Sequence, residues 1–254
     1  MSWRRRASLG VLMLSMAGCG TLDPSVSSVR ELTRPEIIRF SSLAAGDPLP
    51  AGWQPWTFGA FKKPTDYKLV AMEGRTVIRA SASRSASGLI HPLRCSAREF
   101  PMLTWRWKVP ELINGADNAR QHAEDSPVRI VVAFEGDVSK LPALERITFN
   151  QFRMLTKNEL PYATLMYIWE NRAPRETILE SPHTSRIRML VAESGAARLG
   201  EWREETRDLY ADFKRAFGEE PPPIKWIGIM TDTDNTGEDT SAYYGDIELV
   251  ARSR

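Results

Sequence analysis

Short runs of apolar residues, separated by glycine, proline and polar residues, recur through most of the chain. Several runs alternate apolar and polar positions with the period of two that a half-buried β-strand requires. In residues 105–109 two tryptophans and a valine share one face, and an arginine and a lysine share the other. The pattern predicts ten strands, at residues 36–41, 66–72, 75–81, 87–93, 102–109, 128–135, 162–170, 186–193, 224–231 and 243–251.

Residues 204–217 follow a helical period instead. Leu209, Phe213 and Phe217 recur every four residues among charged ones, and Gly218 follows where a helix C-terminus favours glycine. This predicts a helix that packs on a sheet through Leu209 and Phe213. Because no helical pattern separates most of the strands, alternating β-α units are excluded. The prediction is a mainly β fold, a two-layer antiparallel β-sandwich (jelly-roll-like) with one amphipathic helix.

The N-terminal residues have the layout of an export signal. Arginines at 4–6 precede an uncharged stretch up to Gly18, which is shorter than the roughly 20 residues of a membrane-spanning helix. Residues 16–19 resemble the lipobox of bacterial lipoproteins, although Leu is usual where Met16 stands. The resemblance implies a lipid on Cys19 and a bilayer as partner through its acyl chains, and an ordinary signal peptide is the alternative. Since Gly20 is not the Asp of an inner-membrane retention signal, the expected location is the outer membrane, facing the periplasm.

These features divide the chain into a lipoprotein signal peptide (residues 1–18), a lipidated tether (residues 19–35) and a single β-sandwich domain (residues 36–254). The whole chain has 34 basic and 32 acidic residues. Removing the signal leaves 31 basic and 32 acidic residues, because it takes away three arginines and no acid. This balance gives no support for nucleic acid as a partner. Cys95 is the only other cysteine, so it is expected to be a structural thiol without a disulfide.

The order of several short motifs resembles a bacterial domain family of unknown function, number 3047. The resemblance extends from about Ile37 to Leu249. It implies a jelly-roll sandwich, because the closing strand is similar to the last strand of carbohydrate-binding jelly rolls, but it supplies no activity. One departure is Glu124, where the family more often has a second Asp. The matching motifs lie at residues 85–89, 103–109, 124–125, 167–169, 212–218, 230–237 and 243–247.

The densest polar segment directly follows the ninth predicted strand. Its spacing of Asp232, Asp234 and Thr236 matches the first half of a calcium-binding helix–loop–helix, but the twelfth position is Tyr243 instead of Glu. Two interpretations stay open. Asp232, Asp234 and Thr236 form a calcium site, or Asp234 and Asn235 cap a polar β-turn.

A second acidic loop ends at Asp125, just before the strand at residues 128–135. If that strand is antiparallel to the one at residues 224–231, Asp125 and Asp232 lie at the same rim of the sandwich. Carboxylates gathered there can hold a cation, accept hydrogen bonds from sugar hydroxyls, or cleave a glycoside when they stand about 5–10 Å apart. The candidate ligand-binding residues are Asp125, Asp232, Asp234, Asn235, Tyr243 and Tyr244.

Aromatic and basic side chains define further candidate surfaces. Tryptophans inside strand patterns are expected in the core, namely Trp105, Trp107, Trp169 and Trp226. Aromatic residues in loops or at edges are expected to bind a ligand, namely Trp53, Trp56, Tyr243 and Tyr244. Basic residues on polar strand faces are expected on one outer sheet face, namely Arg106, Lys108, Arg129, Arg188 and Lys225. Two interpretations stay open for these residues. They bind an anionic ligand, or they form solvated ion pairs along the sheet with Glu135, Glu170 and Glu193.

No motif for nucleophilic or zinc-dependent catalysis is present in the sequence. Among the three histidines, only His122, near Glu124 and Asp125, is placed for an acid–base pair. The leading prediction is an envelope lipoprotein that binds a carbohydrate-like or other polar ligand, with calcium as an optional structural ion. A glycan-acting hydrolase or lyase that uses rim carboxylates, and an accessory subunit for a protein partner, are the alternatives.

Overall fold

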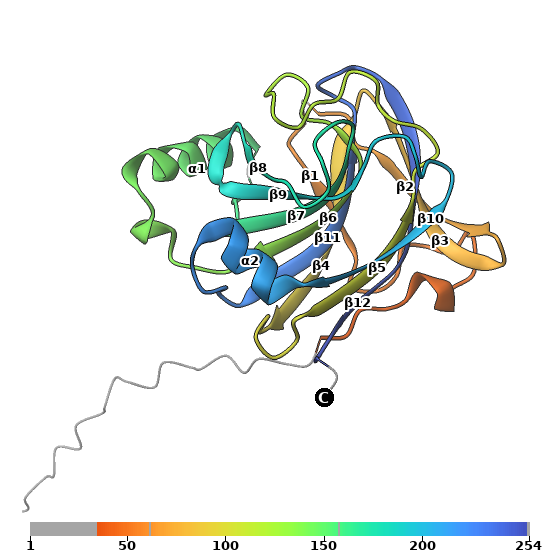
Figure 1. Ribbon diagram of the computed structural model, residues 1–254, viewed down its shortest axis with the longest axis horizontal. Helices are drawn as coiled ribbons and strands as arrows, with labels where there is room; N and C mark the ends of the chain where they lie inside the picture. Colours follow the sequence, from red (N-terminus) through yellow and green to blue (C-terminus); the bar gives the residue numbers. More distant parts are fainter. Residues whose placement is uncertain (1–34, 61, 157, 253–254) are drawn as a thin grey trace, which may run out of the picture. The chain divides into compact units, whose positions relative to one another are not determined.

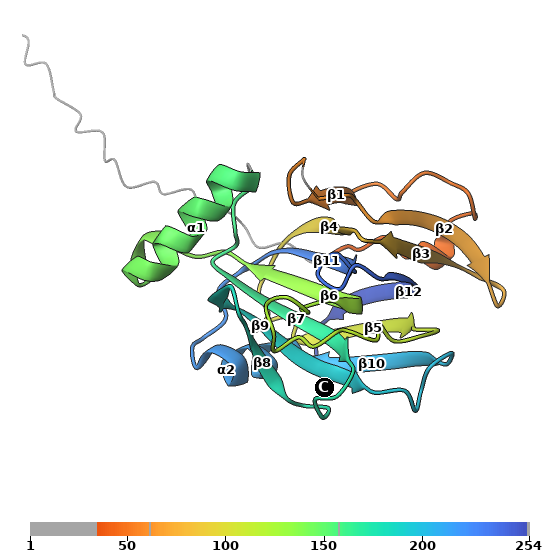
Figure 2. The same ribbon diagram turned by 90° about the horizontal axis from the view of Figure 1, so that it is seen from above.

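The computed structural model describes residues 35–60, 62–156 and 158–252. The predicted signal peptide, Cys19 and nearly all of the predicted tether lie outside the described residues. Leu32–Arg254 forms one compact unit, and two β-sheets pack face to face in it (Figures 1 and 2). No helix in the described part of the chain is long and apolar enough to cross a membrane.

The two sheets contain seven and five strands. Neighbouring strands pair antiparallel, with the exception of β7 and β9, which are parallel. The predicted two-layer, jelly-roll-like sandwich is therefore confirmed. In spatial order, the larger sheet consists of β1 (Gln54–Thr57), β4 (Ala86–Cys95), β11 (Ile224–Asp232), β6 (Ser126–Phe134), β7 (Ala163–Glu170), β9 (Thr184–Ser194) and β8 (Ile178–Ser181). The smaller sheet consists of β10 (Trp202–Asp208), β5 (Met102–Lys108), β12 (Asp239–Val250), β3 (Arg75–Ser83) and β2 (Asp66–Met72).

The core between the sheets is rich in aromatic rings. Trp105 and Trp107 are buried as predicted, and their ring centroids lie 5.3 Å apart. Trp105 also packs on Tyr167 of the opposite sheet at 4.9 Å. Such tilted aromatic pairs stabilise a core beyond the area they bury. They hold the two layers together at the middle of the sandwich.

The larger sheet is apolar on its outer face as well. Because side chains alternate along a strand, β6 gives Ile130 and Val132 to the core between the sheets and Val131 to a second apolar cluster on the opposite face. Trp226 is buried as predicted, but it belongs to this outer cluster. The continuous apolar run of β6 therefore marks a central strand that is covered on both faces.

Only the second half of the predicted helix at residues 204–217 is helical. Residues Trp202–Asp208 form β10, because they pair in regular register with β5. Helix α2 (Leu209–Phe217) begins where the Asp208 carboxylate accepts a hydrogen bond from the Ala211 backbone N–H, and it ends at Gly218, whose φ is 70°. As predicted, Leu209 and Phe213 are buried.

Two further predictions about local structure were wrong. Residues 36–41 do not form a strand, because no described strand pairs with them; a short 3-10 helix, Phe40–Ser42, stands there instead. The prediction of a single helix missed α1 (Ala143–Thr156), whose apolar residues do not form one core-facing stripe. A second 3-10 helix (Val138–Lys140) precedes α1.

Candidate functional site

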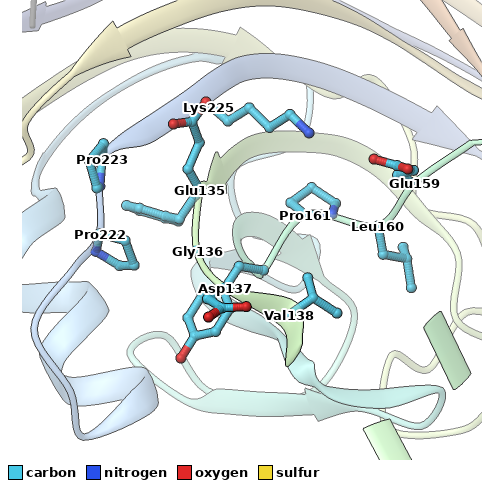
Figure 3. A pocket seen from close by; sticks show the side chains of 12 residues that line it. Glu135, Gly136, Asp137, Val138, Glu159, Leu160, Pro161, Pro222, Pro223 and Lys225 are labelled. Atoms are coloured by element: carbon cyan, nitrogen blue, oxygen red, sulfur yellow. The ribbon is translucent and has the colours of Figure 1, made fainter. Parts of the chain in front are cut away.

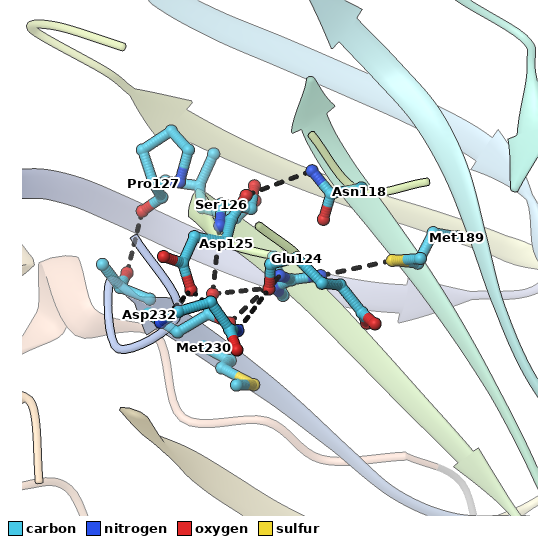
Figure 4. A network of polar contacts seen from close by, with 12 residues as sticks. Asn118, Glu124, Asp125, Ser126, Pro127, Met189, Met230 and Asp232 are labelled. Atoms are coloured by element: carbon cyan, nitrogen blue, oxygen red, sulfur yellow. Dashed lines mark hydrogen bonds and ion pairs between the residues drawn. The ribbon is translucent and has the colours of Figure 1, made fainter. Parts of the chain in front are cut away.

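The structure brings Asp125, Asp232 and Asp234 together at one rim of the larger sheet. Each offers a carboxylate oxygen, and these oxygens all lie within 4.8 Å of one another. The cause is the antiparallel pairing of β6 and β11, which sets Ser126 opposite Asp232. We refer to these three carboxylates as the rim cluster, and Figure 4 shows the polar contacts around two of them.

Asp232 forms a buried ion pair with Arg129. The Arg129 Nε lies 2.9 Å from Asp232 Oδ1, and Nη2 lies 3.0 Å from Oδ2, so the contact is bidentate. Burial raises the pKa of Asp232 to about 7, against the opposing effect of Arg129. Arg129 was predicted on an exposed face, and that prediction was wrong because Asp232, Met189 and the Glu124 carbonyl enclose its guanidinium group. Its Nη2 also donates to the Glu124 carbonyl (Figure 4).

Asp125 is buried, and it organises the loop that follows β11. Its Oδ2 accepts hydrogen bonds from the Thr236 backbone N–H and hydroxyl, both at 2.7 Å. Its Oδ1 accepts from the Asn235 side-chain amide at 3.1 Å. Asp234 forms an ion pair with Lys62. Asn235 and Thr236 are therefore tied to the acidic loop before β6, and Asp234 is tied to Lys62.

These contacts fill most of the hydrogen-bonding capacity of the rim cluster. Arg129 and Lys62 balance two of its three negative charges. Calcium on Asp232, Asp234 and Thr236 stays a prediction; the ion would have to displace Lys62 from Asp234 and compete for the Thr236 hydroxyl. Asp125 and Asp232 have almost no exposed surface. The geometry therefore suits side chains that hold two loops together better than side chains that contact a glycan.

The other predicted binding residues are spread over the fold. Tyr243 and Tyr244 lie inside β12, where successive side chains point to opposite faces. The Tyr244 hydroxyl is buried and donates to the Met230 carbonyl at 2.6 Å. Trp53 is buried as well, and the half-buried Trp56 packs on Trp226 at 5.1 Å between ring centroids.

The basic residues predicted to share one outer face belong to both sheets. Arg106 and Lys108 come from β5, whereas Arg188 comes from β9 and Lys225 from β11. The predicted pairing with Glu135, Glu170 and Glu193 is also wrong, since other partners lie nearer in the fold. The ion pairs formed include Lys108–Glu73, Arg188–Glu180, Arg94–Glu135 and Arg203–Glu193.

Glu124, a half-buried acid, lies beside the hairpin of β8 and β9. Its Oε2 is 3.7 Å from His183 Nε2 and 3.3 Å from the Ser181 hydroxyl. Burial raises its pKa. Ser181 and His183 line an open pocket of about 350 Å³. The sequence pointed to His122 as the partner of Glu124 because it is close in the chain, but the partner comes from a distant hairpin.

A larger open pocket, of about 590 Å³, lies where β6 ends and where β7 and β11 begin (Figure 3). A methyl group on Gly136 would stand 2.3 Å from the Tyr162 ring, so the ring can lie there only because residue 136 is a glycine. The sequence gave no sign of this pocket because three separate segments form it. The lining includes Glu135, Asp137, Glu159, Pro161, Tyr162, Pro222, Pro223 and Lys225.

Comparison with protein families gives one match. The family described as "Protein of unknown function (DUF3047)" matches residues 51–248. The chain belongs to this family. The predicted membership is thereby confirmed, and a comparison of the DUF3047 chain with curated proteins finds no match.

Among solved structures, the DUF3047 domain is similar to sandwiches of low sequence identity. The xyloglucanase domain of NopAA, a type three effector from Sinorhizobium fredii, in complex with cellobiose, has 8% identity and a TM-score of 0.42, over 79% of this chain and 93% of that one. CtCBM11 has 11% identity and a TM-score of 0.36, over 81% and 91% of the two chains. The family GH12 endoglucanase 3 of Trichoderma harzianum has 7% identity and a TM-score of 0.39, over 81% and 100%. Such distant likeness says nothing about the ligand of this chain.

Proposed function

We propose that this DUF3047 protein is a lipoprotein of the cell envelope whose sandwich domain binds a hydroxyl-rich, carbohydrate-like ligand. The observation that carries the proposal is the open pocket of about 590 Å³ where β6 ends and where β7 and β11 begin. Its volume falls within the roughly 300–1,000 Å³ that is typical of small-molecule sites. The rim cluster holds the neighbouring loops in place and is not the ligand site.

The lining of the pocket suits sugars in two ways. Glu135, Asp137 and Glu159 supply carboxylate oxygens that accept hydrogen bonds from hydroxyl groups. Hydrogen bonds from Ser139 lower the pKa of Asp137 and keep it ionised as an acceptor. Three prolines and Tyr162 add apolar surface on which the C–H face of a pyranose ring can lie.

The charges in the pocket set the expected selectivity. Lys225 is the basic residue of the lining, and Glu159 is an exposed acid across from it. A neutral oligosaccharide needs only the carboxylate acceptors for its hydroxyl groups. The carboxylate of a uronic acid forms an additional charge-assisted hydrogen bond with Lys225. We therefore expect Glu159→Ala to weaken binding of neutral sugars several-fold, since one hydrogen bond contributes about 0.5–1.5 kcal/mol.

The test is calorimetric titration of residues 32–254, the compact unit that contains every described strand and helix. The titrants are neutral and uronic-acid oligosaccharides. Lys225→Ala should reduce affinity for uronic acids more than for neutral sugars. Glu111→Ala is the matched control, because Glu111 is an exposed carboxylate outside the pocket. Absence of binding by the whole panel, or equal losses in the control, would overturn the proposal.

A second candidate function, a glycan-acting hydrolase, is favoured by one observation. Glu124 has a raised pKa beside the pocket lined by Ser181 and His183, and carboxyl groups that act as general acids have raised pKa values. Incubating the same oligosaccharides with the protein tests this. Release of new reducing ends that Glu124→Gln abolishes would replace the binding proposal with an enzymatic one.

A further inference from the structure

Helix α1 (Ala143–Thr156) exposes an unusual amount of apolar surface. Leu144, Ile147, Met154 and Leu155 are 75%, 53%, 73% and 69% exposed. Of the six large apolar residues most exposed in the described part of the chain, these four lie on this helix. Figures 1 and 2 show α1 standing to one side of the two sheets.

The exposed residues form one stripe. At about 100° per residue, their positions fall within an arc of roughly 100° around the helix. The opposite, inward side of α1 has its own contacts: Phe149 is buried, and Glu145 accepts hydrogen bonds from the Ser185 backbone N–H and hydroxyl. The helix therefore already contacts the domain by one face, and the stripe faces away from these contacts.

Basic side chains outnumber acidic ones on α1. Glu145 is its only acid, and it is used inward against β9. Arg146 and Arg153 are exposed and lie about 130° and 150° around the helix from the middle of the stripe. An apolar stripe on one face, with basic residues on the opposite, polar face, is typical of helices that lie in the interface of an anionic bilayer.

From this stripe and the basic residues on the other side of the helix, we infer that α1 lies flat on the surface of an anionic lipid bilayer, with Leu144, Ile147, Met154 and Leu155 in the apolar layer. The inference rests on the anchoring part of the proposed function. Cys19 precedes the first described residue, Pro35, by sixteen positions, which span at most about 55 Å when fully extended. A lipid on Cys19 would keep the domain within that distance of the bilayer, and α1 would then fix which side faces it.

The test uses residues 32–254, so that no lipid on Cys19 contributes. The protein is sedimented with vesicles of phosphatidylglycerol and phosphatidylethanolamine, and in parallel with vesicles of phosphatidylcholine alone. We expect binding to the anionic vesicles and weaker binding to the neutral ones. The double variant Leu144→Ser/Leu155→Ser should lower the partition coefficient at least tenfold, since each leucine loses its burial in lipid.

The matched control is Ile38→Ser/Val250→Ser, which removes two exposed apolar residues outside α1. It should bind vesicles as the unaltered protein does. Thermal unfolding of both double variants shows whether they are folded. Failure to bind anionic vesicles overturns the inference, and so does a dimer in light scattering that the Leu144→Ser/Leu155→Ser variant abolishes, which would assign the stripe to a second copy. Neither result affects fatty-acid labelling of Cys19, so the anchor and the helix are tested separately.

Discussion

Removal of Arg129 would isolate the charge of Asp232 inside the protein. The side chains of the pair are only 2% and 5% exposed. Removing one partner of a buried ion pair costs about 3–5 kcal/mol, because the other charge stays buried without compensation. We therefore expect Arg129→Leu to lower the free energy of unfolding by that amount at pH 8. For a domain of this size, the melting temperature should fall by roughly 6–20 °C.

The loss should depend on pH in a defined direction. Without Arg129, burial raises the pKa of Asp232 further above the value of about 3.9 in an unfolded chain. A carboxyl with a raised pKa favours the folded state when it is protonated and disfavours it as the pH rises through the folded pKa. The variant should therefore lose less stability at pH 5 than at pH 8, as measured by urea unfolding of residues 32–254.

Two further variants identify the cause. Arg129→Leu/Asp232→Asn contains no isolated charge, so it should recover more than half of the loss at pH 8. Arg198→Leu breaks an exposed ion pair with Glu201, and such pairs contribute about 0–1 kcal/mol. The reasoning is refuted if Arg129→Leu costs less than about 1 kcal/mol at pH 8, or if the double variant is no more stable than the single one.

The remaining predictions concern the two cysteines. Burial raises the pKa of the Cys95 thiol to about 12, so a disulfide reagent at pH 8 should label it only after denaturation of residues 32–254; labelling of the native protein at the rate of a free thiol would contradict its placement. Cys19→Ser in the full chain should abolish incorporation of radioactive fatty acid and release the protein from membranes, and unchanged labelling would end the lipoprotein proposal.

Much of the fold follows from local pattern. Alternating apolar residues or continuous apolar runs predict β2 to β7 closely, because burial of one or both faces of a strand determines which of its residues are apolar. The border between β10 and α2 could not be found in this way. Residues 204–208 are compatible with a helix by their local pattern. They form a strand because they pair with β5, which is distant in the sequence, with Glu205 opposite Trp105. Helix α1 was missed because its exposed apolar residues break the rule that apolar faces mark the core.

The candidate site shows the same division between local and long-range information. That Asp125 and Asp232 meet could be deduced, because it requires only that β6 and β11 pair antiparallel. The residues that surround these two carboxylates could not be deduced from the sequence. Arg129 occupies a position that alternation assigns to solvent, yet the loop residues Asn235 and Thr236 bond to Asp125 and close over that rim. The large pocket combines three segments that no spacing along the chain brings together.

The connection between β6 and β7 has a consequence for how proteins of this kind can change. The last described pair of these strands joins Phe134 to Ala163, so residues 135–162, with α1 among them, form an excursion from a simple antiparallel hairpin. Loops of two to five residues are enough to join such strands. The excursion can therefore be shortened, exchanged or extended without altering strand order. It is the position where evolution or an engineer could graft a new targeting or recognition element onto the same sandwich.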